Sequence, residues 1–260
     1  MFSPNPFQGG FGVPSKHKIP SLRDLGFYFN EKMSYPLIKK YADLVSETND
    51  LDRNRCIQEG FSPSRVIVIQ GGVDTKLSMA VPEPPRKEFD AVFIGRLHPQ
   101  KGLLELIDIW KIVSGKKEDA KLAIIGNGPL ENEIKEKIRK CGLESNVVLF
   151  GFKDGFEKVK IFKNSRIVVH PAVYDSGGMA ACEAMSCGLP GVSFNLPALK
   201  TYYPKGMLKT PCFDFAAFAD TILKLIEDQT FYQNVAEDAL CLARSWDWAE
   251  VSAKVLDKLL

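Results

Sequence analysis

Residues 90–102 read Asp-Ala-Val-Phe-Ile-Gly-Arg-Leu-His-Pro-Gln-Lys-Gly, a short apolar run that leads into a loop with glycine at both ends. An apolar run without alternation is typical of a strand that helices cover on both faces. Similar runs recur at residues 121–125, 146–150, 166–170 and 191–194. Amphipathic stretches between them occupy residues 103–113, 130–141 and 179–186. This alternation predicts an α/β fold with right-handed βαβ units and a doubly wound parallel sheet.

The composition excludes several classes of protein. The chain has 260 residues, with 34 Lys and Arg against 32 Asp and Glu, so its formal charge of +2 disfavours a nucleic-acid partner. No run of about 18 apolar residues predicts a transmembrane segment, and the first residues lack the pattern of a signal peptide. The six cysteines form no Cys-x-x-Cys pair, and we expect reduced thiols. These features predict a cytoplasmic protein, with peripheral attachment to a membrane left open.

The sheet-forming region is flanked by other segments. Residues 76–88 carry three prolines and no periodicity, which predicts a linker. Before it, residues 1–75 are expected to form an incomplete N-terminal α/β segment, with strands at 42–46 and 66–69 around a short helix. After it, residues 89–244 are expected to form the main, ligand-binding domain. Residues 245–260 are expected to form a final helix with Ser245 as its N-cap.

The loop at residues 95–102 carries two cations, Arg96 and Lys101, between a strand and a helix. Ligands of such sheets bind at the carboxyl ends of the strands, where helix N-termini also present free amides. The arrangement therefore predicts a diphosphate site. The alternative is that both side chains are surface cations in a tight turn.

The next strand ends in Gly126-Asn127-Gly128-Pro129. No third glycine follows at dinucleotide spacing, and this is not the first strand of the sheet, so a nicotinamide site is disfavoured. We interpret Gly126 and Gly128 as a tight turn that lets a ligand approach the backbone.

Residues 170–190 contain more candidate functional residues than any other segment. Asp175 precedes Gly177-Gly178, and a second acid, Glu183, lies within the expected helix that follows. Glycine amides can receive phosphate oxygens, and carboxylates can accept hydrogen bonds from hydroxyls. Phosphate together with a polyol is what a nucleotide-sugar presents. The alternative makes Asp175 a turn residue and Glu183 a solvated helix acid, although the apolar neighbours of Glu183 argue against full solvation.

This segment resembles the donor-binding signature of family 4 retaining glycosyltransferases, which have the two-domain architecture called GT-B. The family pattern has two acids separated by seven residues, as Asp175 and Glu183 are, and residues 183–190 (Glu-Ala-Met-Ser-Cys-Gly-Leu-Pro) follow its second half. Residues 95–102 resemble the family's diphosphate loop, and residues 71–74 (Gly-Gly-Val-Asp) resemble its domain junction. The final helix resembles the one that crosses back to the first domain. The first acid is normally Glu, and Asp175 is one methylene shorter.

The resemblance implies roles for particular residues. Arg96 and Lys101 would neutralise the donor diphosphate without a metal, and Asp175 would contact the donor sugar; these three would be the catalytic residues. Glu183 would bind the ribose hydroxyls. The other donor-binding residues would be Gly95, Gly126, Gly128, Gly151, Phe152, Ser176, Gly177, Gly178 and Met179. The base would lie near Gly151 and Phe152, whereas Phe152 in the core is the alternative. For His98 and His170, each beside a proline, we favour turn or packing roles.

The function implied is a retaining glycosyltransferase that moves a sugar from a nucleoside diphosphate sugar to a hydroxyl acceptor, saccharide or lipid-linked. No cofactor and no metal is implied. The alternative is a non-catalytic nucleotide-sugar-binding protein, or a donor-binding subunit completed by a separate partner or by a second copy. Because residues 1–75 resemble only the end of an acceptor-binding domain, the chain is expected to be truncated and inactive by itself.

Overall fold

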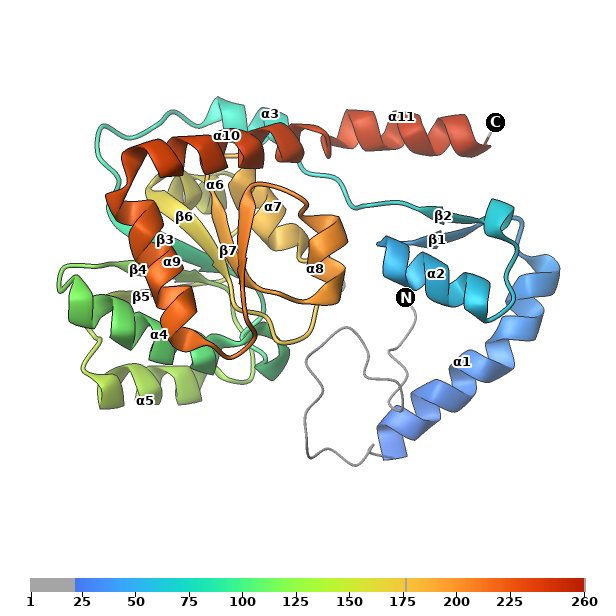
Figure 1. Ribbon diagram of the computed structural model, residues 1–260, viewed down its shortest axis with the longest axis horizontal. Helices are drawn as coiled ribbons and strands as arrows, with labels where there is room; N and C mark the ends of the chain where they lie inside the picture. Colours follow the sequence, from blue (N-terminus) through green and yellow to red (C-terminus); the bar gives the residue numbers. More distant parts are fainter. Residues whose placement is uncertain (1–21, 176, 260) are drawn as a thin grey trace.

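The computed structural model describes residues 22–175 and 177–259, and its larger unit is built on a six-stranded sheet (Figure 1). The strand order is β5-β4-β3-β6-β7-β8, and every neighbouring pair is parallel. The strands are β3 (Phe89–Ile94), β4 (Leu122–Ile125), β5 (Val147–Gly151), β6 (Ser165–His170), β7 (Gly191–Phe194) and β8 (Met207–Thr210). The predicted doubly wound parallel sheet is therefore confirmed, and β8 is a strand that the sequence did not reveal.

Helices cover both faces of this sheet (Figure 1). They are α4 (Leu103–Lys116), α5 (Glu131–Cys141), α6 (Gly155–Lys163), α7 (Met179–Met185), α8 (Pro197–Tyr202), α9 (Phe215–Glu227) and α10 (Gln229–Arg244). Successive residues of a strand point to opposite faces, so Phe93 packs in the core with α4, α5 and α9, whereas Val92 packs in the core with α6 and α7. Two cores, one on each face, explain why the strands read as continuous apolar runs.

The direction in which the chain crosses the sheet reverses at one place. From β3 the chain proceeds to β4 and β5 in one direction, and from β6 it proceeds to β7 and β8 in the other. Since β3 and β6 are hydrogen-bonded neighbours, the loops that follow them, which begin at residues 95 and 171, start side by side, and the amides of Val173 and Tyr174 donate to the Gln100 carbonyl. In open α/β sheets, ligands bind at such a topological switch point.

A smaller unit precedes the sheet. It consists of α1 (Leu22–Tyr41), β1 (Val45–Glu47), α2 (Asp50–Gln58), a 3₁₀ turn (Pro63–Arg65) and β2 (Val66–Val68). The strands β1 and β2 pair in parallel, and Cys56 and Phe61 contribute to a separate small core. The two predicted strands around a short helix are thus present.

Two expectations about the connecting segments require correction. The expected linker, residues 76–88, begins inside α3 (Thr75–Ala80), because Asp74 caps this helix at the amide of Leu77 and the helix packs against α6. Ser245 does not cap the final helix: it ends α10, and its hydroxyl donates to the Leu242 carbonyl. The final helix, α11 (Trp248–Leu259), begins after Asp247, whose carboxylate accepts from the amide of Ala249.

The chain passes between the two units twice, and the two passages are hydrogen-bonded to each other. Val73 donates to the Trp246 carbonyl, and Trp248 donates to the Val73 carbonyl. Beyond this point α11 runs beside the end of β2 (Figure 1), where Val251 and Val255 line a small pocket with Val68. The final helix therefore returns to the smaller unit, as the resemblance implies.

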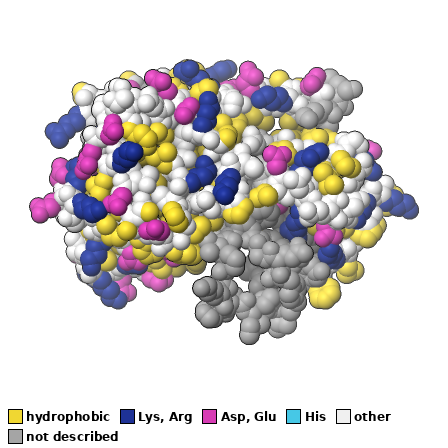
Figure 2. Space-filling view, in the orientation of Figure 1, with side chains coloured by type: hydrophobic (Ala, Val, Ile, Leu, Met, Phe, Trp, Pro, Cys, Tyr) yellow, Lys and Arg dark blue, Asp and Glu magenta, His cyan; other side chains and the backbone are white. Residues whose placement is uncertain are grey.

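Acidic and basic side chains are interspersed on the surface seen in Figure 2, which agrees with a formal charge of +2. None of the helices in the described ranges combines the length and apolar character that a membrane-spanning helix needs.

Gly126 provides a test of how closely the loops pack. Its φ is +140°, and an added Cβ would lie 1.9 Å from the Gly95 carbonyl oxygen. We expect Gly126→Ala to lower the free energy of unfolding by about 1–3 kcal/mol, because backbone would have to move. Gly115→Ala is the control: Gly115 lies in α4 with no atom within 4 Å of the added Cβ, and alanine there should stabilise by about 0.5–1 kcal/mol. Urea unfolding gives the free energy of unfolding of each variant. Equal values for Gly126→Ala and Gly115→Ala would contradict the expectation.

Candidate functional site

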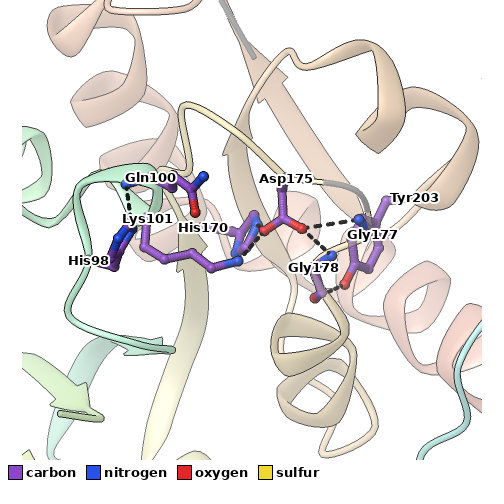
Figure 3. A network of polar contacts seen from close by, with 8 residues as sticks. All are labelled: His98, Gln100, Lys101, His170, Asp175, Gly177, Gly178 and Tyr203. Carbon is purple, nitrogen blue, oxygen red and sulfur yellow. Dashed lines mark hydrogen bonds and ion pairs between the residues drawn. The ribbon is translucent and has the colours of Figure 1, made fainter. Parts of the chain in front are cut away.

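The loop after β3 brings Lys101 to the switch point. A 3₁₀ turn (Pro99–Lys101) is capped by His98, whose Nδ1 accepts from the amide of Gln100 at 3.4 Å. The turn ends at Gly102, with φ +67°, where an added Cβ would lie 1.9 Å from the Pro171 carbonyl oxygen. Only glycine lets the β3 loop approach the β6 loop this closely. Lys101 can therefore reach across from one loop to the other, as Figure 3 shows.

Asp175 is the centre of a polar network in the β6 loop (Figure 3). Its Oδ2 atom lies 2.6 Å from Lys101 Nζ and 3.0 Å from His170 Nε2. Its Oδ1 atom accepts from the amides of Gly177 at 3.0 Å and Gly178 at 2.8 Å. The side chain is only 6% exposed. A buried carboxylate with four partners ties the two loops together.

The charge of Asp175 is strongly stabilised. Burial alone would raise the pKa of its carboxyl, but the hydrogen bond and charge of His170, and after them those of Lys101, outweigh burial and hold the pKa far below its ordinary value. Asp175 is therefore ionised at neutral pH.

This arrangement differs from two expectations. The amides of Gly177 and Gly178 were expected to meet donor oxygens, yet both point at Asp175. Asp175 was expected to contact the donor sugar, yet each of its oxygens already has two partners, which fills the acceptor capacity of a carboxylate. The physical reason is local, because a short Asp side chain readily accepts from backbone amides two and three residues ahead.

Glu183, on α7, faces α6 through an ion pair that the sequence did not reveal. Lys158 Nζ lies 3.2 Å from Glu183 Oε1 and 3.1 Å from Oε2, and 3.0 Å from Asp154 Oδ1. The Glu183 side chain is 36% exposed, so the fully solvated alternative is wrong. Spacing predicts the contact between Lys158 and Asp154, four residues apart on one helix. No sequence signal links Lys158 to Glu183, because the two residues lie on separate helices that only the folded chain brings together.

The structure places the remaining predicted donor-binding residues as follows. Gly126 and Gly128 let two loops pack together, since an added Cβ at Gly128 would lie 2.5 Å from the Leu97 carbonyl oxygen. Phe152 is 69% exposed, so the alternative that places it in the core is wrong. Met179 accepts a hydrogen bond from the Tyr202 hydroxyl. Gly95, with φ +156°, turns the chain at the end of β3, and Gly151, with φ +67°, ends β5. Ser176 lies outside the described residues.

Two buried residues support the network and were not assigned to it from the sequence. His170 is at the end of β6, and an added Cβ at Gly178 would lie 2.9 Å from its Nε2 atom. The hydroxyl of Tyr203 donates to the Gly178 carbonyl. The packing role favoured for His170 thus includes a hydrogen bond to Asp175. The only sequence signal for this bond was the position of His170 at the carboxyl end of a predicted strand.

Arg96 follows Gly95 at the same edge, and its side chain is exposed. In the described part of the chain, no group of three or more His, Cys, Asp or Glu side chains is arranged to hold a metal ion. The cysteines offer no activated nucleophile near the site, because burial raises the pKa of the Cys187 thiol to about 11 and that of Cys182 above its ordinary value.

Comparison with known proteins places this geometry in a family. The family model described as "Glycosyl transferases group 1" matches residues 74–240. An uncharacterized glycosyltransferase of Methanocaldococcus jannaschii is 30% identical over 173 residues, 62% of this chain and 42% of that protein. The phosphatidylinositol N-acetylglucosaminyltransferase gpi3 subunit of Schizosaccharomyces pombe is 23% identical over 94% of this chain and 54% of its own length. The chain thus spans about half the length of these curated relatives or less.

A solved structure agrees with the fold. Anabaena HepE, in complex with UDP and glucose, has a TM-score of 0.78 and 21% identity over 94% of this chain and 69% of HepE. The family match covers the whole sheet from β3 to β8, together with both loops of the switch point. The chain belongs to the glycosyl transferases group 1 family.

Proposed function

We propose that this chain binds a nucleoside diphosphate sugar at the carboxyl edge of its six-stranded sheet and transfers the sugar, with retention, to a hydroxyl acceptor. The observation that carries the proposal is the Lys101–Asp175 ion pair across the switch point, with Glu183 on the helix that follows. The family and the UDP complex of HepE support a nucleotide donor.

In the proposed reaction, the bond between the anomeric carbon and the diphosphate breaks and its electron pair leaves on the diphosphate. The acceptor hydroxyl oxygen forms the new bond to the anomeric carbon on the same face, and the hydroxyl proton passes to the leaving diphosphate. Lys101 has three N–H donors, and the two that do not point at Asp175 are available to phosphate oxygens. Arg96 adds a planar, permanently charged donor at the same loop. Fixed cations stabilise the negative charge that develops on the leaving diphosphate and so lower the activation barrier of transfer. Here Lys101 and Arg96 would take the role that a metal ion has in other enzymes.

Asp175 acts in this proposal mainly by holding Lys101 and the Gly177–Gly178 loop in place. A direct contact between Asp175 and a sugar hydroxyl would require the sugar to displace one of its four donors. Glu183 accepts hydrogen bonds from the two ribose hydroxyls, and the exposed ring of Phe152, next to Gly151, offers a surface on which the base can stack.

The second candidate is a donor-binding subunit that acts with a separate partner. The observation that favours it is the relative from Schizosaccharomyces pombe, which matches 94% of this chain and is named as a subunit. A radiolabelled-donor assay on the purified chain, with a sizing measurement beside it, separates the two. Transfer by the monomer supports the enzyme and contradicts the expectation that the chain is inactive by itself, whereas transfer that appears only with a partner supports the subunit. In either case a cytoplasmic location is proposed, and the six free thiols support it.

The proposed donor site is tested by nucleotide binding without metal. Calorimetric titration with UDP, GDP and ADP should show binding of at least one, with the same affinity when a chelator is present, because Arg96 and Lys101 supply the positive charge. Binding that disappears with the chelator would overturn the metal-free part. No binding to any of the three would overturn the proposal as a whole.

A further inference from the structure

Lys158 is the most enclosed cation beside the proposed ribose site. Its side chain is 13% exposed, and its ammonium contacts both oxygens of Glu183 at nearly equal distances of 3.2 and 3.1 Å. Burial alone would lower the pKa of Lys158, but Asp154 and Glu183 outweigh it and raise the pKa. Lys158 therefore stays charged at neutral pH, and the ion pair persists there.

The location of Lys158 connects the two parts of the proposed nucleotide site. It lies in the first turns of α6, directly after the loop that carries Gly151 and Phe152, whereas Glu183 lies on α7 after the β6 loop. An ordinary ion pair four residues apart on a helix, such as Lys135 with Glu131, has an exposed lysine and joins residues of a single element. The Lys158–Glu183 pair joins two elements, and Lys158 reaches the carboxylate from the helix that follows Gly151 and Phe152.

The Lys158–Glu183 ion pair also reduces two costs of placing the Glu183 carboxylate beside a bound diphosphate. A carboxylate near a bound diphosphate repels it, and a carboxylate free to rotate loses entropy when it accepts two hydroxyl hydrogen bonds. A cation at about 3 Å from both oxygens offsets the charge and restricts the rotation. Each oxygen keeps a second lone-pair site for a hydroxyl donor.

We propose that Lys158 is the positioning residue that holds the Glu183 carboxylate for the two hydroxyls of the nucleotide ribose, so that ribose recognition depends on a residue of α6. The inference rests on the proposed function, because it assumes a nucleoside diphosphate donor. It concerns how the chain discriminates ribose from deoxyribose.

The experiment compares three variants by calorimetry. The probes are whichever of UDP, GDP and ADP binds best and its 2′-deoxy and 3′-deoxy analogues. Lys158→Met removes the charge, and Lys158→Arg keeps it. Lys163→Met is the matched control: Lys163 lies on the same helix, is 14% exposed and pairs with Glu83 at 2.6 Å, away from Glu183. Thermal unfolding of each variant shows whether it is folded.

We expect the unchanged chain to bind the ribonucleotide about tenfold more tightly than its deoxy analogues, as lost hydrogen bonds to a carboxylate predict. Lys158→Met should reduce this preference to less than about threefold, Lys158→Arg should retain most of it, and Lys163→Met should leave it unchanged. A full ribose preference in Lys158→Met would overturn the inference while the proposed donor site stands. If the unchanged chain binds no nucleotide, the proposed function fails and the inference fails with it.

Discussion

Asp175→Asn is expected to lower the free energy of unfolding by about 3 kcal/mol at neutral pH, because it removes a buried carboxylate that four donors surround. The amide of asparagine can replace one oxygen toward the glycine amides, but its NH₂ group cannot accept from Lys101 or His170. Urea unfolding at pH 7 measures the loss. Asp119→Asn, which changes an exposed ion pair with Lys117, is the control and should cost less than about 1 kcal/mol.

The effect of Asp175 should also depend on pH in a definite direction. Its folded pKa lies below that of an unfolded aspartate, about 3.9, so the unfolded chain takes up a proton first as pH falls. The stability that Asp175 contributes is present above about pH 4 and is lost as pH falls below it. The difference in free energy of unfolding between the original chain and Asp175→Asn should therefore narrow as pH falls below about 4. If the difference in free energy of unfolding widens below pH 4, the result would contradict the hydrogen bonds and ion pair of Asp175 described above.

Glu183→Gln is expected to weaken nucleoside diphosphate binding by about 1.5–3 kcal/mol, because a charged acceptor for the ribose hydroxyls is replaced by a neutral one. Lys158 keeps Asp154 as a partner, and Glu183 is partly exposed, so thermal stability should change little. Calorimetry and thermal unfolding on the same samples separate the two effects.

The outcome that contradicts this role of Glu183 is also specific. If the affinity is unchanged and the stability falls, Glu183 is a structural acid that serves only to pair with Lys158. Glu131→Gln is a suitable control, because Glu131 pairs with Lys135 on α5 and should affect neither measurement.

The sequence alone determined the parts of this protein that depend on neighbouring residues. Apolar runs without alternation identified five of the six strands of the sheet, since a strand covered on both faces needs no polar side. The glycines and cations of residues 95–102, and the acids of residues 175 and 183, predicted the edge at which we propose that the donor binds. The missed strand β8 follows a short helix, α8, and is half-buried at its centre, so its apolar signal is weaker.

Only the tertiary structure decided which of these residues act together. Lys101 and Asp175 are 74 residues apart in sequence, and Lys158 and Glu183 are 25 apart. Each pair meets because a parallel sheet delivers the carboxyl ends of separate strands to one edge. The contacts of Asp175 with the amides of Gly177 and Gly178 are different, because they are local and depend on residues two and three positions ahead. Periodicity records which face of an element is buried, whereas the partner of a charged side chain depends on strand order, and strand order is a property of the folded chain.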